Sequence, residues 1–170
     1  MQRWIVLALA IWSMAFSSFS ADSSEQLAAG SYQIRNRKFG ELLRPENANN
    51  ADGTHIVLYP AQPWKCMTWK LLPTGSGSFC LQNHFTSKTF EAKKNDAVFT
   101  VVQVPWARQN SNRPAWRFIK LPDGFYRIAD ERSGNCLSAS SKDVITLAPA
   151  KETSEQQWEL LLTDPAKLTM

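Results

Sequence analysis

The sequence is poor in the residues that carry catalysis or bind metals. It contains only two histidines, His55 and His84, and three cysteines among 170 residues. No two cysteines lie at the tight spacing that a metal site needs. There is no Gly-x-Ser-x-Gly motif, and no pair of carboxylates stands out as the acid and base of a glycosidase. We therefore expect a protein that is not an enzyme and uses no cofactor or metal.

A strong charge imbalance and a long apolar run are also missing. The formal net charge is +4, and so mild a basic balance gives no reason to expect a nucleic-acid partner. The apolar residues 4–16 fall short of the roughly 20 residues of a membrane span. They follow Arg3 and precede small residues at Ser18 and Ser20. This pattern predicts a secretory signal peptide over residues 1–20, no stable membrane span, and a secreted or periplasmic protein.

Helical periodicity is absent after position 24. Short runs of alternating polar and apolar residues are separated by turn residues, as at 73–77 and 122–124. Many short strands at regular spacing are typical of a β-sandwich or barrel. We expect one all-β domain over residues 30–163, with a linker over 21–29 and a tail over 164–170.

The alternating pattern occurs three times. Residues 31–36, 78–83 and 125–130 follow one another at a spacing of 47 residues, and in each the alternation is that of a half-buried strand. Two sets of single residues share this register: a turn position at Gly40, Ser87 and Gly134, and an inward position at Leu43, Phe90 and Leu137. The chain therefore contains three similar units.

Two further strands complete each unit. The third strands are expected over residues 55–59, 98–104 and 144–148, each followed by a proline, which suits a strand end because proline cannot donate to the ladder. A tryptophan stands at the start of each fourth strand, at Trp69, Trp116 and Trp158. We expect these indoles to fill a shared core together with Tyr32, Phe79 and Tyr126.

Three four-stranded units that each close on a tryptophan resemble a β-trefoil. The Gln156-x-Trp158 element matches the Q-x-W signature of the ricin B-chain-like lectins, and residues 52–59 also resemble a segment of that family. The resemblance covers residues 31–161. It implies a β-trefoil of three four-stranded repeats with pseudo-threefold symmetry, closed as a barrel with a hairpin cap.

The resemblance also implies where sugars would bind. In this family a pocket has an acidic side chain after the second strand, an aromatic ring after the third, and amide groups near the signature. The acidic position is occupied by Arg44, Glu91 and Ser138, the aromatic position by Tyr59, Val104 and Ala148, and the signature Gln position by Met67, Pro114 and Gln156. Because no unit keeps the whole set, we do not expect the family's usual galactose pocket.

The candidate carbohydrate-binding residues are Arg44, Tyr59, Trp64, Glu91, Trp106 and Gln156. The two loop tryptophans could be platforms for a sugar ring or lids over the core, and Tyr59 could instead pack on Lys65. Glu91 could be a solvated strand end.

Basic residues and turn residues also stand out around the first unit. Arg44 and the nearby Arg35, Arg37 and Lys38 could attract an acidic sugar or sulfated chain, or be ordinary surface charge. We expect Asn36, Asn83 and Asp130 to hydrogen-bond the hairpin turns.

The three cysteines, Cys66, Cys80 and Cys136, leave two possibilities open. Export would permit a disulfide, and Cys66 and Cys80 flank one predicted hairpin, so they are the first candidate pair. Three unpaired thiols are the alternative.

Three functional hypotheses follow. The first is a secreted, non-catalytic protein that recognises glycans, neutral or acidic, at surface pockets of units one and two. The second is a trefoil with degenerate sugar sites that binds a protein partner, resembling the A and C subunits of cytolethal distending toxins. A trefoil protease inhibitor is a third, but no disulfide-braced inhibitory loop is visible.

Overall fold

The computed structural model describes residues 27–95, 98–106 and 113–169, so the predicted signal peptide lies outside it. Unit one contains β1 (Gly30–Asn36), β2 (Leu42–Pro45), β3 (Ile56–Tyr59) and β4 (Thr68–Pro73). Unit two contains β5 (Phe79–Asn83), β6 (Thr89–Asn95), β7 (Val98–Val104) and β8 (Trp116–Lys120). Unit three contains β9 (Tyr126–Asp130), β10 (Cys136–Ala139), β11 (Ile145–Ala148) and β12 (Trp158–Leu162). The helices of the described ranges are short 3-10 turns: η1 (Glu46–Ala48), η2 (Lys65–Met67), η4 (Ser154–Gln156) and η5 (Pro165–Lys167).

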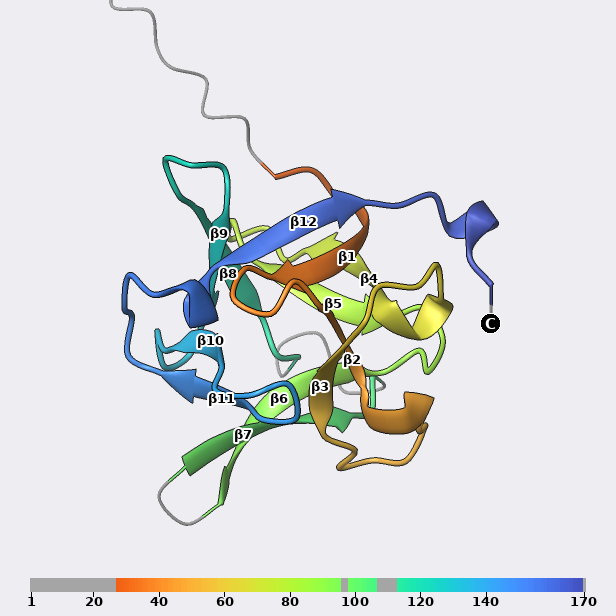
Figure 1. The fold of residues 1–170 in the computed structure, drawn as a ribbon, viewed down its shortest axis with the longest axis horizontal. Coiled ribbons are helices and arrows are strands. Elements are labelled where there is room, and N and C mark those ends of the chain that lie inside the picture. The colour runs from red at the N-terminus through yellow and green to blue at the C-terminus, as the bar shows by residue number, and fades with distance from the viewer. Residues whose placement is uncertain (1–26, 96–97, 107–112, 170) are drawn as a thin grey trace, which may run out of the picture.

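The first and fourth strands of the three units form a closed barrel (Figure 1). β1 pairs with β4 and β12, β5 pairs with β4 and β8, and β9 pairs with β8 and β12, all antiparallel. Each of these strands therefore has a neighbour on both sides, which removes the open edges of the sheet. The second and third strands pair as the hairpins β2–β3, β6–β7 and β10–β11. They are the extra strands beyond the barrel.

The three hairpins share one register. Leu42 lies opposite Tyr59, Thr89 opposite Val104, and Cys136 opposite Ala148. Two residues further along the second strands, Arg44 faces Val57, Glu91 faces Val102, and Ser138 faces Thr146. The residues that the sequence alignment placed in equivalent positions are therefore equivalent in space, and the fold is the predicted β-trefoil.

The turn after the first strand is built in the same way in all three units. Gly40, Ser87 and Gly134 have φ angles of 67°, 57° and 71°. Their N–H groups donate to the carbonyl oxygens of Asn36, Asn83 and Asp130 at 2.9, 3.0 and 2.8 Å. The side-chain oxygens of those three residues accept backbone N–H groups of the same turns, so their predicted turn role is confirmed.

The three signature tryptophans are fully buried at the centre of the molecule. Trp69 donates from Nε1 to the Leu43 carbonyl at 2.9 Å, and Trp158 donates to the Leu137 carbonyl at 3.1 Å. Trp116 differs, because its buried Nε1 has no hydrogen-bond partner among the described residues. In place of a leucine, unit two has Phe90, whose ring lies 4.9 Å from both the Trp69 and the Trp116 ring. Phe90 thus links the tryptophans of units one and two by aromatic contacts.

Several details differ from the sequence predictions. The third strands of units one and three begin one residue later than expected, at Ile56 and Ile145. His55 forms only an isolated bridge with Val102. Tyr126 is half-buried, whereas Tyr32 and Phe79 belong to the core.

The segments flanking the predicted domain are attached to it. Leu27 packs against the core, and Tyr32 Oη donates to the Ala28 carbonyl at 3.1 Å. At the other end, Thr169 forms a parallel bridge with Trp64. Residues 27–29 and 164–169, predicted as parts of a linker and a tail, therefore contact the trefoil.

The cysteines are free, buried thiols, so the candidate disulfide between Cys66 and Cys80 does not form. Burial raises the pKa of all three thiols, against the opposing effect of a nearby arginine. No helix in the described part of the chain is long and apolar enough to cross a membrane. Within the same ranges, no group of three or more His, Cys, Asp or Glu side chains could hold a metal ion.

Candidate functional site

A surface pocket of about 330 Å³ opens in unit one. Small-molecule pockets span roughly 300–1,000 Å³, so this one has room for a small ligand such as a single sugar residue. Its lining comes from β2, η1, the end of β3, the loop into η2 and the turn after β5: Arg44, Asn47, Ala48, Tyr59, Trp64, Cys66 and Phe85. The pocket therefore lies where units one and two meet.

Aromatic side chains form one part of the pocket wall. Tyr59 and Trp64 are stacked, with ring centroids 6.0 Å apart and planes inclined by 29°. Phe85, which follows β5, is 44% exposed. Flat aromatic faces can pack against the apolar C–H face of a sugar while hydroxyl groups remain free to hydrogen-bond. Tyr59, for which packing on Lys65 was the alternative, contacts Trp64 and Arg44.

Arg44 forms the charged part of the wall. All four residues of β2 are buried, and Arg44 is only 7% exposed. Its guanidinium carbon lies 3.7 Å from the centroid of the Tyr59 ring, which is a cation–π contact. Its Nε is buried without a hydrogen-bond partner among the described residues. Unit one therefore places a buried cation where related sugar pockets have an acid.

The floor beside Arg44 includes a strained turn. Asn47 and Ala48 have φ angles of 53° and 51°, in the left-handed region that non-glycine residues rarely adopt. The Asn49 N–H donates to the Glu46 carbonyl at 2.9 Å and closes the turn. Both residues line the pocket, and strained backbone of this kind is common at ligand sites.

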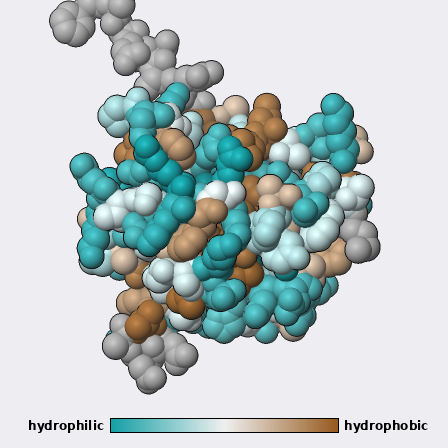
Figure 2. Space-filling model, in the orientation of Figure 1, coloured by the Kyte–Doolittle hydropathy of each residue, from teal (hydrophilic) through white to brown (hydrophobic). Residues whose placement is uncertain are grey.

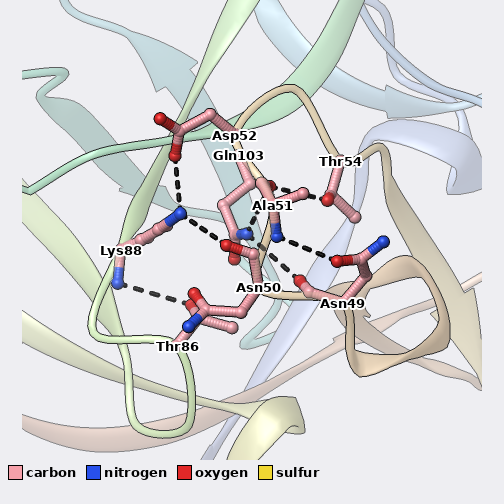
Figure 3. A network of polar contacts seen from close by, with 8 residues as sticks. All are labelled: Asn49, Asn50, Ala51, Asp52, Thr54, Thr86, Lys88 and Gln103. Carbon is pink, nitrogen blue, oxygen red and sulfur yellow. Dashed lines mark hydrogen bonds and ion pairs between the residues drawn. The ribbon is translucent and has the colours of Figure 1, made fainter.

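A polar network fixes the loop that follows this turn (Figure 3). The buried side chain of Gln103 on β7 donates from Nε2 to the carbonyl oxygens of Asn49 and Ala51, at 3.2 and 3.0 Å. Lys88 from unit two donates to the Asn50 carbonyl and to Asp52 Oδ1, the latter at 2.6 Å. Unit two thus holds the loop of unit one in position.

The Trp64 backbone is fixed from two directions. Its carbonyl accepts from the N–H of Met67 at 3.0 Å and from the Thr68 hydroxyl at 3.2 Å. The C-terminal segment runs beside η2 (Figure 1). There Thr169 donates its N–H to the Pro63 carbonyl at 2.8 Å and accepts from the Lys65 N–H at 3.0 Å. The C-terminal segment therefore takes part in positioning the aromatic wall.

Of the six candidate residues, the structure brings together only Arg44, Tyr59 and Trp64. Trp106 lies in unit two, where the Arg113 guanidinium covers its ring at 4.3 Å. The two residues line a separate pocket of about 180 Å³ that does not include Glu91. Unit two therefore does not reproduce the arrangement of unit one.

Gln156 serves the architecture of unit three. Its side chain is 1% exposed, accepts the Lys151 N–H at 2.7 Å and donates to the Pro149 carbonyl at 2.9 Å. These bonds hold the loop between β11 and β12. A ligand could reach the amide only by breaking them.

The three other basic residues of the predicted basic front are paired with acids. Arg35 contacts Glu159 at 2.6 Å, Lys38 contacts Glu155 at 2.8 Å, and Arg37 pairs with Asp123. The hydrogen bond from Lys38 lowers the pKa of Glu155 to about 2. The basic front expected from the sequence is therefore largely neutralised, and Arg44 is not part of it.

Sequence reasoning missed four residues of the pocket: Asn47, Ala48, Cys66 and Phe85. A signal existed only for Phe85, as a large apolar residue within a predicted turn. The other three carry no pattern of their own, because they reach the pocket through the unusual backbone of η1 and through η2.

Comparison with protein families agrees with this geometry. A family model described as "Ricin-type beta-trefoil lectin domain-like" matches residues 2–105, more than half of the chain. The protein belongs to this family. The pocket of unit one lies within the matched residues, and this member of the ricin-type trefoil lectin-like family has an arginine at its acidic position.

Solved structures share the fold at low sequence identity. The designed threefold-symmetric protein ThreeFoil is 24% identical with a TM-score of 0.70, over 78% of this chain and 98% of that one. The ricin B-like lectin of Macrolepiota procera, solved with lactose, is 19% identical with a TM-score of 0.68, over 81% of this chain and 99% of that one.

An exo-β-1,3-galactanase from Clostridium thermocellum also contains the fold. It is 19% identical with a TM-score of 0.71, over 80% of this chain but only 31% of the enzyme. No curated protein matches the chain significantly.

Proposed function

We propose that this protein is a non-catalytic lectin that holds a glycan in the pocket of unit one. The observation that carries the proposal is the convergence of the stacked Tyr59 and Trp64 with the buried Arg44 on one surface pocket. Ring faces and a hydrogen-bond donor are the two elements that sugar recognition needs. Membership of a lectin-like family and the fold shared with a lactose-bound lectin support the same conclusion.

The lining of the pocket supports binding without catalysis. It contains one charged side chain, Arg44, and no carboxylate that could act as a general acid or base. Ser31 Oγ and His84 Nε2 lie 2.8 Å apart, but neither residue lines the pocket. Burial, followed by the charges of Lys70 and Lys65, lowers the pKa of His84.

A glycan array with the purified protein and two variants tests the proposal. Trp64→Ala removes one face of the stacked pair, and we expect it to weaken glycan binding at least about tenfold, the equivalent of about 1.4 kcal/mol. Trp106→Ala is the matched control, because Trp106 is a half-buried loop tryptophan outside this pocket. Equal losses in both variants, with the fold intact by circular dichroism, would contradict the assignment to unit one.

The array also separates the lectin from a trefoil that binds a protein partner. Figure 2 shows the apolar residues of one face in small separate patches among hydrophilic residues. We favour the glycan because the unit-one pocket joins aromatic faces to a buried hydrogen-bond donor. Failure to bind any glycan would refute this choice and leave the protein-binding hypothesis.

We further propose that the protein is exported after removal of residues 1–20. The charged start, short apolar stretch and small residues before Ala21 support this. Mass spectrometry of the secreted or periplasmic fraction should find a mature chain beginning at Ala21. Detection of the intact chain in the cytoplasm alone would contradict export.

A further inference from the structure

The most unusual group of the unit-one pocket is a buried cation with no acidic partner. Arg44 is 7% exposed and forms no ion pair with any described residue, and its Nε lacks a hydrogen-bond partner. Burial of an unpaired charge is strongly unfavourable. The Tyr59 ring at 3.7 Å offsets only part of this penalty. The site is therefore electrostatically incomplete as it stands.

The neighbouring positive charges are not available to a ligand in the same way. Arg35, Lys38 and Arg37 already pair with Glu159, Glu155 and Asp123. A long polyanion gains its affinity from many unpaired cations along its path, and these three pairs leave few of them near the pocket. The exposed Lys65 follows Trp64 in the chain but does not line the pocket. Arg44 can instead neutralise one anionic group that enters the pocket.

Resting on the proposed function, we propose that the unit-one pocket selects a glycan carrying a single anionic group, a carboxylate or a sulfate, and that this group pairs with Arg44. A guanidinium binds such planar or tetrahedral oxyanions through two parallel N–H···O bonds. The sugar ring that carries the group lies against the aromatic wall of Trp64 and Phe85, because Arg44 already covers one face of Tyr59.

The inference is specific to unit one. At the equivalent positions of the other hairpins stand Glu91, which would repel an anion, and Ser138, which has no charge. At the place where the family pattern has an aromatic ring, these two units have the buried Val104 and the half-buried Ala148. One anionic glycan per chain is therefore expected.

Isothermal titration with matched ligand pairs tests the inference. The pairs are galacturonate with galactose, galactose 6-sulfate with galactose, and a sialylated glycan with its desialylated parent. Because hydrogen bonds to charged groups are stronger than those between neutral groups, at least one acidic member should bind about tenfold or more tightly than its neutral partner. The pair that shows the preference distinguishes a carboxylate from a sulfate ligand.

Variants assign the preference to Arg44. Arg44→Gln should abolish the preference, and Arg44→Lys should reduce it, because lysine keeps the charge but not the two-pronged geometry. Lys65→Gln is the matched control, since this exposed lysine does not line the pocket. If Arg44→Gln fails to fold, the salt dependence of the wild-type preference takes its place, and the preference should weaken as NaCl rises.

The outcomes separate this inference from the proposed function. Equal binding of acidic and neutral members by the wild type would overturn the role of Arg44 and leave the lectin intact. An acidic preference that survives Arg44→Gln would also overturn it. Binding of no member of any pair would overturn the anionic preference, and the absence of any hit on the full array would overturn the lectin as well.

Discussion

The same substitution at three equivalent positions gives a sharp test of the internal symmetry. We consider Trp→Phe at Trp69, Trp116 and Trp158, which are fully buried and lie at or one residue after the start of the fourth strands. Each change removes the same atoms from the same central core. Trp69 and Trp116 both contact the Phe90 ring at 4.9 Å, so what distinguishes these two is the hydrogen bond of the indole.

The structure gives the expected difference. Trp69 and Trp158 donate to buried carbonyl groups at 2.9 and 3.1 Å. Phenylalanine would leave these carbonyls unpaired at a cost of about 1–3 kcal/mol each. At Trp116 no such bond exists among the described residues, and the change removes a buried N–H that already lacks a partner. Trp116→Phe should thus be the mildest of the three by about 1–3 kcal/mol.

Urea unfolding followed by circular dichroism measures the three free energies of unfolding. For a chain of this size, about 1 kcal/mol corresponds to a shift of about 2–4 °C in the melting temperature, so thermal unfolding provides a second measurement. Equal losses within about 0.5 kcal/mol, the usual scatter of independent sites, would refute the reasoning. So would a largest loss at Trp116.

Three other predictions follow from the geometry. Ser87→Gly should raise the free energy of unfolding by about 0.5–1 kcal/mol. The substitution relieves the strain of the left-handed backbone, and this gain exceeds the entropy that glycine loses on folding. Urea unfolding measures the change, and a loss of stability would count against the prediction. Gln156→Ala should cost about 1–3 kcal/mol while glycan affinity by titration calorimetry stays unchanged; a matching loss of affinity would instead place Gln156 in a binding site. Lys38→Gln should return the pKa of Glu155 from about 2 towards the ordinary glutamate value, as measured by NMR titration. Because the folded-state pKa is lowered, the stabilisation by this pair exists above the ordinary glutamate pKa and is lost as pH falls towards 2; an unchanged pKa in the variant would show that Lys38 is not its cause.

The fold could be predicted because its signals repeat. Trp69, Trp116 and Trp158 lie in one register. Each is a large apolar residue, and all three are buried in the shared core. The turn at Gly40, Ser87 and Gly134 was also predictable, because two of the three residues are glycines and the backbone requires a positive φ there. Repetition turns weak local signals into a specific one.

The site could be predicted only in part, because binding depends on departures from the repeat. Arg44 was found because it departs from the family pattern, Tyr59 because it keeps that pattern, and Trp64 because it lies outside the core register. Phe85 comes from the next unit, and no spacing rule within unit one connects it to the pocket. Gln156 carries the signature of the family, yet its amide holds a loop, since one motif can serve the fold as well as a ligand.

The proposed function requires that a glycan binds against Trp64. The most direct test is an NMR titration of the indole N–H signals with the best ligand from the array, with Trp64 assigned from a Trp64→Phe variant. We expect a saturable shift of the Trp64 signal, while the signals of Trp69, Trp116 and Trp158 stay in place. A ligand that binds while the Trp64 signal does not move, or that shifts Trp106 instead, would contradict it.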